Sequence, residues 1–504
     1  MNFVKNTVIF SIATFISRIL GYIRDAVVAH YFGANQLTDA FYIAWRLPNT
    51  LRQLVAEGSF SAAFIPIYTQ EYQKSPQNAK EYAASLFSYY TIVLSSITVF
   101  VVLFAEGFVR IIAPGFSERG NLQLTAELVR IVFPYLILIG WTSFFMALLN
   151  TKDRFFIPGV APALLNLSFI FSSVLFSSYI GIYALAVGAL LGGFLQFLLQ
   201  IPQAYKEGLI FKPTLKKHPQ INITLKKVLP AFASFGVSQF SFVIDTILAS
   251  FLYAGAISYL YYGNRIFQLP LGLFIIGLGN ALLVSLSKHY SEKNLQAFSK
   301  DLTLSFKMSI IVSLPAMAGM VFLGKEIIDV LLVRGAFTLN DAILTYYALV
   351  GYAVGLLGYA FTRPFKSAFF AMGDTKTPLF STVIGLISSI LLALLFTFIF
   401  KWEVFGLALA SSLGAYINSL YLYFKCTYQI DLKGISISFL KSFLSTMAMV
   451  LVIEIIKVFS IGIFFTVFGG IILGSFVYIL SNLILKEDST TLFLNLVKKK
   501  LGRI

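Results

Sequence analysis

The chain has 504 residues, of which 58% are hydrophobic and 12% are charged, and its formal net charge is +16. This charge does not indicate a nucleic-acid-binding protein, because the Lys and Arg residues cluster in alternate loops between apolar stretches. Three His residues and one cysteine, Cys426, leave little material for metal or nucleophilic chemistry, and the sequence lacks phosphate-binding-loop and Gly-x-Ser-x-Gly motifs. We therefore expect a protein that is not an enzyme and has no resident cofactor.

Apolar stretches of about 20 residues recur along the chain, which is the length that crosses about 30 Å of hydrocarbon. The sequence therefore predicts an all-α polytopic membrane protein with about fourteen transmembrane helices. In chain order, the predicted spans are 6–29, 38–61, 83–108, 122–149, 155–178, 182–204, 228–250, 256–286, 303–324, 341–370, 378–400, 404–424, 438–458 and 462–485.

The distribution of basic residues sets the predicted orientation. One set of alternate loops holds most of the lysines, among them Lys152, Lys216 and Lys288, whereas the opposite loops hold few basic residues, such as Arg119 and Lys401. Cytoplasmic loops carry the excess of Lys and Arg, so the lysine-rich loops and both termini are predicted to face the cytoplasm. An even number of spans follows from this orientation.

A Lys- and Pro-rich segment, 205–227, separates two similar halves of the chain. With an offset of about 222 residues, Arg46-Leu47-Pro48 falls on Gln268-Leu269-Pro270. Each half holds six predicted spans, so both halves enter the membrane from the same side and the repeats are parallel. Two six-helix lobes around a central cavity are typical of transporters. The predicted domains are an N-lobe at 1–222, a C-lobe at 223–425 and a C-terminal pair of helices at 426–504.

Several arginines lie inside the apolar stretches that are predicted to span the membrane. An arginine at the bilayer centre costs roughly 2.5–3.5 kcal/mol on insertion scales, so these side chains are expected to face a hydrated cavity or a partner rather than lipid. Few carboxylates lie near them, and a cationic cavity favours an anionic ligand. The arginines concerned are Arg18, Arg24, Arg46, Arg52 and Arg265.

The first predicted helix has one polar face. Ser17 and Arg24 are seven residues apart and therefore lie about 20° apart around the helix, and Arg18 and Asp25 are related in the same way. Gly21 lies between the two rows, and the rest of the helix is apolar. The pattern predicts that this face lines the cavity.

Charged residues of later helices are predicted at overlapping depths. In the second helix, Arg46, Asn49 and Arg52 recur at intervals of three residues and lie on one side. In the other half of the chain, Asp245 and Arg265 occupy the seventh and eighth spans. The charges of both lobes could therefore line one central cationic cavity.

A guanidinium group presents a planar fork that matches phosphate oxygens, so several arginines in one cavity indicate a diphosphate. The carboxylates that would orient these arginines are Asp25, Asp39, Glu57 and Asp245. The alternative is a set of internal salt bridges that hold helices together, and this alternative is favoured for Arg46, which lies close to an outer helix end.

Two further roles follow from predicted depth in the membrane. Glu57 and Arg363 lie in the cytoplasmic thirds of spans from opposite lobes, so a salt bridge between them would close the cavity on the inside. The alternative is that the two residues are solvated separately at the cavity mouth. Asp245 is an intramembrane carboxylate that could bind Na⁺ or a proton as coupling ion, and a salt bridge to Arg265 is its favoured alternative role.

Five motifs of the chain resemble those of one protein family. They are Ser17-Arg18-Ile19-Leu20-Gly21-Tyr22-Ile23-Arg24-Asp25, Thr38-Asp39-Ala40-Phe41, Arg46-Leu47-Pro48-Asn49, Tyr261-Tyr262-Gly263-Asn264-Arg265 and Gly373-Asp374-Thr375-Lys376-Thr377-Pro378. Over essentially the whole chain, the sequence resembles the MurJ (MviN) family of the MOP exporter superfamily, whose members are lipid II flippases of the bacterial inner membrane.

The resemblance implies a set of site residues. The residues implied to contact the lipid II diphosphate are Arg18, Arg24, Arg52 and Arg265. Supporting roles are implied for Ser17, Asp25 and Asp39, and we add Asn49 because it shares a helix face with Arg52. The resemblance also implies that Glu57 and Arg363 belong to a cytoplasmic gate, and that the last two helices line a groove for the undecaprenyl chain. Asp245 matches one contributor to the sodium site of some relatives, but the eleventh span here lacks an Asp.

The expected function is to flip lipid II, a polyprenyl-diphosphate-linked peptidoglycan precursor, from the inner to the outer leaflet of the bacterial cytoplasmic membrane. Alternating access would be driven by the membrane potential or an ion gradient. The alternatives are a flippase for another polyprenyl-diphosphate glycan, a MATE-like exporter, and a membrane scaffold for the cell-wall machinery. We expect a multi-pass monomer whose partners are lipid II and membrane lipids, with no nucleic acid.

Overall fold

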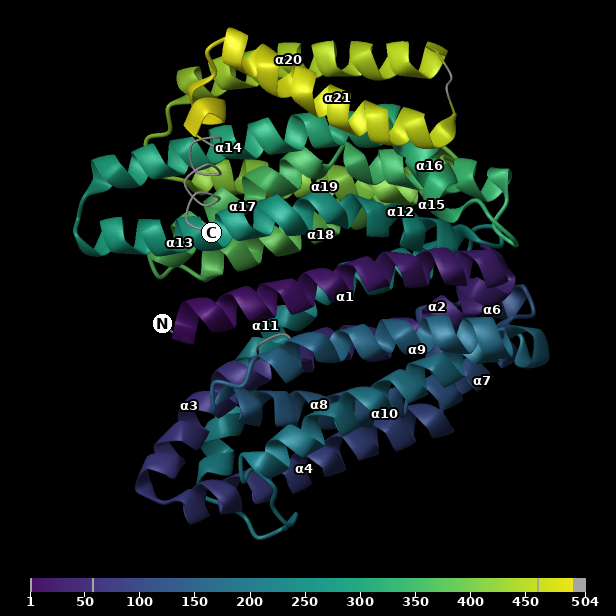
Figure 1. Cartoon of the computed structure of the whole chain (residues 1–504), viewed down its shortest axis with the longest axis vertical. Coiled ribbons are helices and arrows are strands. Elements are labelled where there is room, and N and C mark those ends of the chain that lie inside the picture. The colour runs from purple at the N-terminus through teal and green to yellow at the C-terminus, as the bar shows by residue number, and fades with distance from the viewer. Residues whose placement is uncertain (1, 57–58, 460–461, 493–504) are drawn as a thin grey trace. The chain divides into compact units, whose positions relative to one another are not determined.

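The computed structural model describes residues 2–56, 59–459 and 462–492 (Figure 1). Within these ranges the secondary structure is helical, apart from turns and one isolated bridge between Arg334 and Phe337, and this confirms the all-α prediction. By its contacts the chain divides into two compact units. The first comprises Met1–Ser258 and Arg334–Phe337, and the second comprises Tyr259–Val333 and Thr338–Ile504.

The first unit is built around α9 and α10, which lie side by side, with α1 along α9 (Figure 1). The helix α2 lies against α7 and α8. The helices of this unit are α1 (Asn2–Phe32), α2 (Gln36–Ala56), α3 (Ser59–Lys74), α4 (Pro76–Leu103), α5 (Ala105–Ile112), α6 (Gly115–Glu118), α7 (Leu122–Val132), α8 (Tyr135–Asn150), α9 (Phe156–Ile180), α10 (Tyr183–Lys206) and α11 (Gln220–Ala249). The two helices that carry most of the predicted site, α1 and α2, are thus held by interior helices of the same unit.

In the second unit, α14, α17 and α19 lie between the pair α20–α21 and the helices α13 and α18 (Figure 1). Its helices are α12 (Ala256–Pro270), α13 (Ile276–Ser291), α14 (Leu295–Phe322), α15 (Gly324–Leu332), α16 (Leu339–Ala353), α17 (Leu356–Ala371), α18 (Lys376–Leu394), α19 (Glu403–Lys425), α20 (Leu432–Phe459) and α21 (Ile463–Ile484). Short π-helical segments follow α12 at Leu271–Ile275 and α18 at Leu395–Ile399. The start of α12 belongs to the first unit by its contacts.

Ten helices or helix pairs in the described part of the chain have the length and hydropathy of a membrane span. The other four predicted spans fall on α1, α2, α11 and the segment from α12 to α13. These helices carry several of the predicted intramembrane charges, namely Arg18, Arg24, Arg46, Arg52, Asp245 and Arg265. The count of fourteen therefore stays a prediction. The domain boundary at 222 also stays a prediction, because it rests on the repeat; by contacts, α11 lies against α3 and α5 of the first unit.

The predicted span 122–149 consists of two helices rather than one. Pro134 stands between α7 and α8, and it has no backbone N–H with which to continue the hydrogen-bond ladder of α7. A new ladder begins directly after it. Tyr135 consequently occupies the first position of α8, where its side chain is fully buried.

The Lys- and Pro-rich connection between α10 and α11 lies against α4. Ser85 Oγ donates a hydrogen bond of 2.6 Å to the backbone carbonyl of Lys216. Glu71, at the end of α3, accepts bonds from Lys74 Nζ at 2.7 Å and Gln220 Nε2 at 2.9 Å. The bond from Lys74 holds the pKa of the Glu71 carboxyl below its usual value. These bonds tie the connection to the surface of the first unit.

Candidate functional site

Arg24 and Asp25 of α1 form an ion pair in the first unit. The Nη2 and Nε atoms of Arg24 donate to Asp25 Oδ1 at 2.6 Å and 3.0 Å. The Arg24 guanidinium also lies over the ring of Phe169 in α9, 5.6 Å from its centre. The two charged side chains are 12% and 6% exposed, so the carboxylate and the aromatic ring hold the guanidinium in a largely desolvated position.

Ser17 and Arg18 lie about two turns earlier on α1. The backbone carbonyl of Ser17 accepts a bond of 2.9 Å from Asn166 Nδ2 of α9, which fastens this part of α1 to the interior helix. The Arg18 side chain is exposed, and it has no ion-pair partner among residues 2–56, 59–459 and 462–492. Arg18 therefore presents its charge at the surface of the first unit.

The predicted support of Arg52 by Asn49 corresponds to a direct contact in α2. Arg52 Nε donates to Asn49 Oδ1 at 3.1 Å, as the spacing of three residues on a helix allows. Both residues are half-buried, and so is Arg46 one turn earlier. Pro48 is buried within the same helix. The amide of Asn49 thus fixes one edge of the Arg52 guanidinium.

Tyr135 of α8 lies within the electrostatic influence of both Arg24 and Arg52. The charges of both arginines act on its hydroxyl, which is buried and has no hydrogen-bond partner within the described part of the chain. The Tyr135 ring lies 4.9 Å from the Trp45 ring, centre to centre, and Trp45 in turn contacts Phe169 at 5.4 Å. One aromatic cluster, formed by Trp45, Tyr135 and Phe169, therefore lies beside the Arg24 guanidinium, and the Arg52 charge acts on the same cluster through Tyr135.

Asp39 lies at the start of α2 and caps a helix that is distant in the sequence. Its Oδ2 accepts from Gly255 N at 2.7 Å, and its Oδ1 accepts from Ser258 N at 2.8 Å and Ser258 Oγ at 2.7 Å. The first N–H groups of a helix have no partner within the helix, so a carboxylate there satisfies free donors and meets the positive end of the helix dipole. Asp39 thus joins α2 to the beginning of α12, and its predicted support of the arginines stays a prediction.

Arg265 and Asp245 are both half-buried, Arg265 on α12 and Asp245 on α11. Next to Arg265, the Asn264 side chain accepts a bond of 2.5 Å from Gln268 Nε2 on the same helix. Within the described residues, no group of three or more His, Cys, Asp or Glu side chains could hold a metal ion. The sodium role of Asp245 stays a prediction.

The predicted gate residue Arg363 lies on α17 with an exposed side chain, and its predicted partner Glu57 lies outside the described residues. One turn after Arg363, Lys366 donates from Nζ to Thr382 Oγ1 of α18 at 2.9 Å. Neither cation forms an ion pair with a carboxylate of the described residues. Two neighbouring cations on one predicted membrane span are costly in lipid, and the gate role of Arg363 stays a prediction.

The sequence correctly predicts two pairs of neighbours, Arg24 with Asp25 on α1 and Asn49 with Arg52 on α2. It does not predict that Tyr135 or Lys366 belongs to the candidate site. Tyr135 carries no charge and lies in an apolar helix, so no local signal marks it. Lys366 could have been found, because it is an intramembrane lysine three residues after Arg363. The meeting of the arginines of both halves in one cavity stays a prediction.

A family model described as "Lipid II flippase MurJ" matches residues 28–476 of this chain. The chain is 34% identical over 491 residues to the "Probable lipid II flippase MurJ" of Buchnera aphidicola subsp. Acyrthosiphon pisum (strain APS), and the match covers 95% of each protein. It is 32% identical over 432 residues to the "Lipid II flippase MurJ" of Burkholderia cenocepacia (strain ATCC BAA-245 / DSM 16553 / LMG 16656 / NCTC 13227 / J2315 / CF5610), covering 84% of this chain and 83% of the relative.

Solved structures give the same result. A structure described as "Lipid II flippase MurJ, inward closed conformation" matches with a TM-score of 0.82 and 30% identity, covering 97% of this chain and 100% of that chain. An inward-facing MATE family multidrug transporter of the MOP superfamily matches with a TM-score of 0.67 at 14% identity, over 84% of this chain and 95% of that chain, which shows a shared fold only. On the extent of the family model and of the curated relatives, the chain belongs to the MurJ family of lipid II flippases.

Proposed function

We infer that this chain moves lipid II from the inner to the outer leaflet of the bacterial cytoplasmic membrane. The observation that carries this inference, in a chain of the MurJ family, is that the first unit holds two intramembrane guanidinium groups by direct contacts, Arg24 by Asp25 and Arg52 by Asn49. Guanidinium groups provide the planar paired donors that suit a diphosphate. A MATE-like exporter of cationic drugs would instead need carboxylates directed at its ligand.

The proposed diphosphate site consists of four arginines with their supports. The arginines are Arg18, Arg24, Arg52 and Arg265, and the supporting residues are Ser17, Asp25, Asp39 and Asn49. Asp25 and Asn49 hold Arg24 and Arg52 by direct bonds. Because Arg18 has an exposed side chain, we propose that it makes the first contact with the diphosphate.

We propose that transport follows an alternating-access cycle. Lipid II enters from the inner leaflet with its head group in the cavity and its undecaprenyl chain in a groove along α20 and α21. A membrane potential that is negative inside favours outward movement of an anion, and two charges crossing about 100 mV contribute on the order of 4–5 kcal/mol. Na⁺ or H⁺ remains the alternative coupling ion, with Asp245 as its proposed ligand.

The orientation and partners belong to the same proposal. The chain lies in the inner membrane with both termini in the cytoplasm, because the lysine-rich loops then face inward. Lipid II and the surrounding membrane lipids are its proposed partners, and a monomer suffices because one chain contains both halves of the repeat.

The proposal is tested with purified protein in liposomes that contain fluorescent lipid II in the inner leaflet. We expect the protein to expose the label to an external quencher, and a membrane potential of the favourable sign to raise the rate. Empty liposomes and liposomes with an unrelated membrane protein are the controls. A scaffold would leave the label inside, and depletion of a scaffold in cells would displace the cell-wall machinery without trapping lipid II in the inner leaflet.

The proposed gate gives a charge-swap prediction. Glu57→Arg and Arg363→Glu should each reduce flipping at least tenfold. Each variant puts two charges of the same sign at the proposed cytoplasmic gate, where they repel one another. The double variant Glu57→Arg/Arg363→Glu should recover most of the rate. Lys425→Met, at the exposed end of α19, serves as a control: it removes a cation of the second unit but leaves the proposed pair intact. A double variant as inactive as the singles would contradict the gate.

A further inference from the structure

The helix α14 continues through a proline, which leaves one backbone carbonyl without its helical donor. Pro315 has no N–H, so the carbonyl of Ile311, four residues earlier, cannot form its usual bond within the helix. The hydroxyl of Tyr478, on α21, donates to this carbonyl at 2.8 Å. Ile311 and Tyr478 are 6% and 5% exposed. A buried carbonyl in a membrane protein needs a protein donor, and here a distant helix supplies it.

The same arrangement occurs a second time in this unit. Pro364 lies inside α17, and the carbonyl of Ala360, four residues earlier, accepts a bond of 3.3 Å from Ser309 Oγ of α14. Both Ser309 and Ala360 are almost fully buried. Each proline thus leaves one backbone carbonyl without its helical donor, and a hydroxyl from another helix donates to that carbonyl instead.

The approach of α21 depends on small residues at intervals of four. Gly470, Gly474 and Tyr478 lie on one face of the helix. A Cβ atom at Gly474 would lie 3.1 Å from Met449 Cγ of α20, and one at Gly470 would lie 3.2 Å from Leu323 Cδ2. The two glycines therefore let α21 pack closely enough for the Tyr478 hydroxyl to reach α14.

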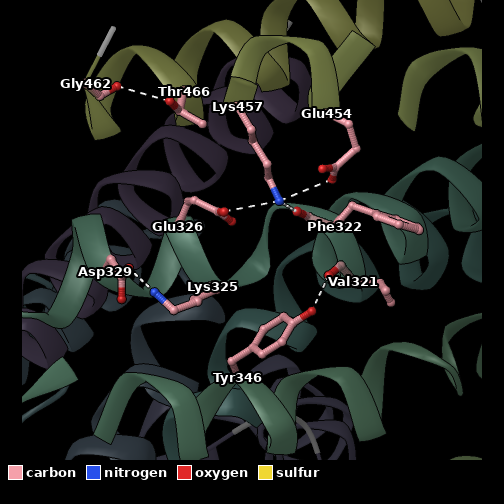
Figure 2. Close-up of polar contacts among 10 residues, drawn as sticks. All are labelled: Val321, Phe322, Lys325, Glu326, Asp329, Tyr346, Glu454, Lys457, Gly462 and Thr466. Atoms are coloured by element: carbon pink, nitrogen blue, oxygen red, sulfur yellow. Dashed lines mark hydrogen bonds and ion pairs between the residues drawn. The ribbon is translucent and has the colours of Figure 1, made fainter. Parts of the chain in front are cut away.

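Charged residues hold the outer end of the same pair of helices (Figure 2). Lys457 Nζ, near the end of α20, lies 3.1 Å from Glu326 Oε1 of α15 and 3.3 Å from Glu454 Oε1 of α20. Lys457 also donates to the backbone carbonyl of Phe322, the last residue of α14. The pair α20–α21 is thus bound to α14 and α15 at its outer end and, through Tyr478, within the membrane.

We propose that Pro315 and Tyr478 act together to fasten α20–α21 to α14, so that the C-terminal pair moves as a rigid part of the second unit during transport. Tyr478 is then a positioning residue: it touches no substrate, and it fixes the helices along which the lipid chain is proposed to run. The transport consequence rests on the proposed function, whereas the fastening itself does not. The proline removes the helical donor to the Ile311 carbonyl, so this carbonyl depends on the Tyr478 hydroxyl for its hydrogen bond.

The test is a double-variant cycle. Tyr478→Phe removes only the hydroxyl and leaves the Ile311 carbonyl without a donor, so we expect flipping to fall about tenfold. Pro315→Ala restores an N–H within α14 that satisfies the same carbonyl. The double variant Pro315→Ala/Tyr478→Phe should therefore be faster than Tyr478→Phe alone. Pro315→Leu, which also restores the N–H, replaces Pro315→Ala if that variant does not fold.

A second readout separates the fastening from the transport activity. With Cys426→Ser as a cysteine-free background, spin labels at Lys300→Cys on α14 and Ile472→Cys on α21 report the distance between these helices. We expect one narrow distance distribution in the parent, a broader one with Tyr478→Phe, and recovery in the double variant. Equal effects of Tyr478→Phe with and without Pro315→Ala would overturn the proposal. If the parent shows no flipping, the distance measurement still decides the fastening.

Discussion

Arg24→Ala is expected to lower the rate of lipid II flipping in liposomes by about 100-fold or more. The Arg24 guanidinium offers paired, charge-assisted donors to a phosphate, and losing such a contact costs about 3 kcal/mol, or roughly two powers of ten in rate. Arg24→Lys keeps the charge but loses the planar fork and its contact over Phe169, so we expect an intermediate loss of about tenfold. The measurement is the initial rate at saturating and subsaturating lipid II.

A structural role for Arg24 can be separated from a binding role. The carboxylate of Asp25 is 6% exposed and pairs with Arg24 at 2.6 Å, so Arg24→Ala alone also leaves a buried charge without this partner. The double variant Arg24→Gln/Asp25→Asn removes both charges. If Arg24 only neutralised Asp25, the double variant would recover flipping. We expect recovery of thermal stability without recovery of flipping, because the fork for the diphosphate is still missing.

Tyr135 gives a milder test of the same cluster. Tyr135→Phe removes a buried hydroxyl on which the charges of Arg24 and Arg52 act, and it should weaken lipid II binding severalfold. We expect little change in stability, since the hydroxyl has no partner to lose within the described part of the chain. The matched control is Tyr90→Phe. The Tyr90 hydroxyl is also buried and has no hydrogen-bond partner within the described part of the chain, but it feels no arginine charge. Equal effects of the two variants would argue against a binding role for Tyr135.

The sequence was sufficient for those features that depend on neighbours along one helix. The all-α fold followed from the length of the apolar stretches, and the contact of Asn49 with Arg52 followed from their spacing of three residues. Arg24 and Asp25 are adjacent in the chain, and their polar face was visible from the spacing of Ser17 and Arg18. Such relations are fixed by helix geometry, which every α-helix shares.

Contacts between distant segments could not be predicted in the same way. The bond between Asp39 and Ser258 joins residues more than two hundred positions apart, and no periodic pattern records it. Because Asp39 is a charge near other charges in the sequence, the sequence predicts that it supports the arginines. The Tyr478 hydroxyl was not singled out, because a tyrosine in an apolar helix more often packs than donates. Both contacts are decided by where a helix begins or is interrupted, and by which helix lies beside that point.

Asp39→Ala is expected to free the start of α12 from α2. The carboxylate accepts three bonds, two from backbone N–H groups and one from Ser258 Oγ, and it is 2% exposed. Bonds to a charged group contribute about 1.5–3 kcal/mol each and are not additive, so we expect a local loss of about 2–4 kcal/mol. Asp39→Asn should also be harmful, because its amide keeps one acceptor oxygen but places an NH2 group against either Gly255 N or the two donors of Ser258.

Opening of the contact between Asp39 and the start of α12 can be measured by cysteine labelling. Thr38 is fully buried beside Asp39, and its hydroxyl accepts from Ser258 Oγ at 3.0 Å. In the Cys426→Ser background, a cysteine placed at Thr38 should react slowly with a membrane-impermeant maleimide, and adding Asp39→Ala should raise the labelling rate at least tenfold. Ser258→Ala removes one of the three donors while keeping the carboxylate and both N–H groups, so it should have a smaller effect. Unchanged labelling with Asp39→Ala would mean that α2 and the start of α12 are held together by packing rather than by the buried carboxylate.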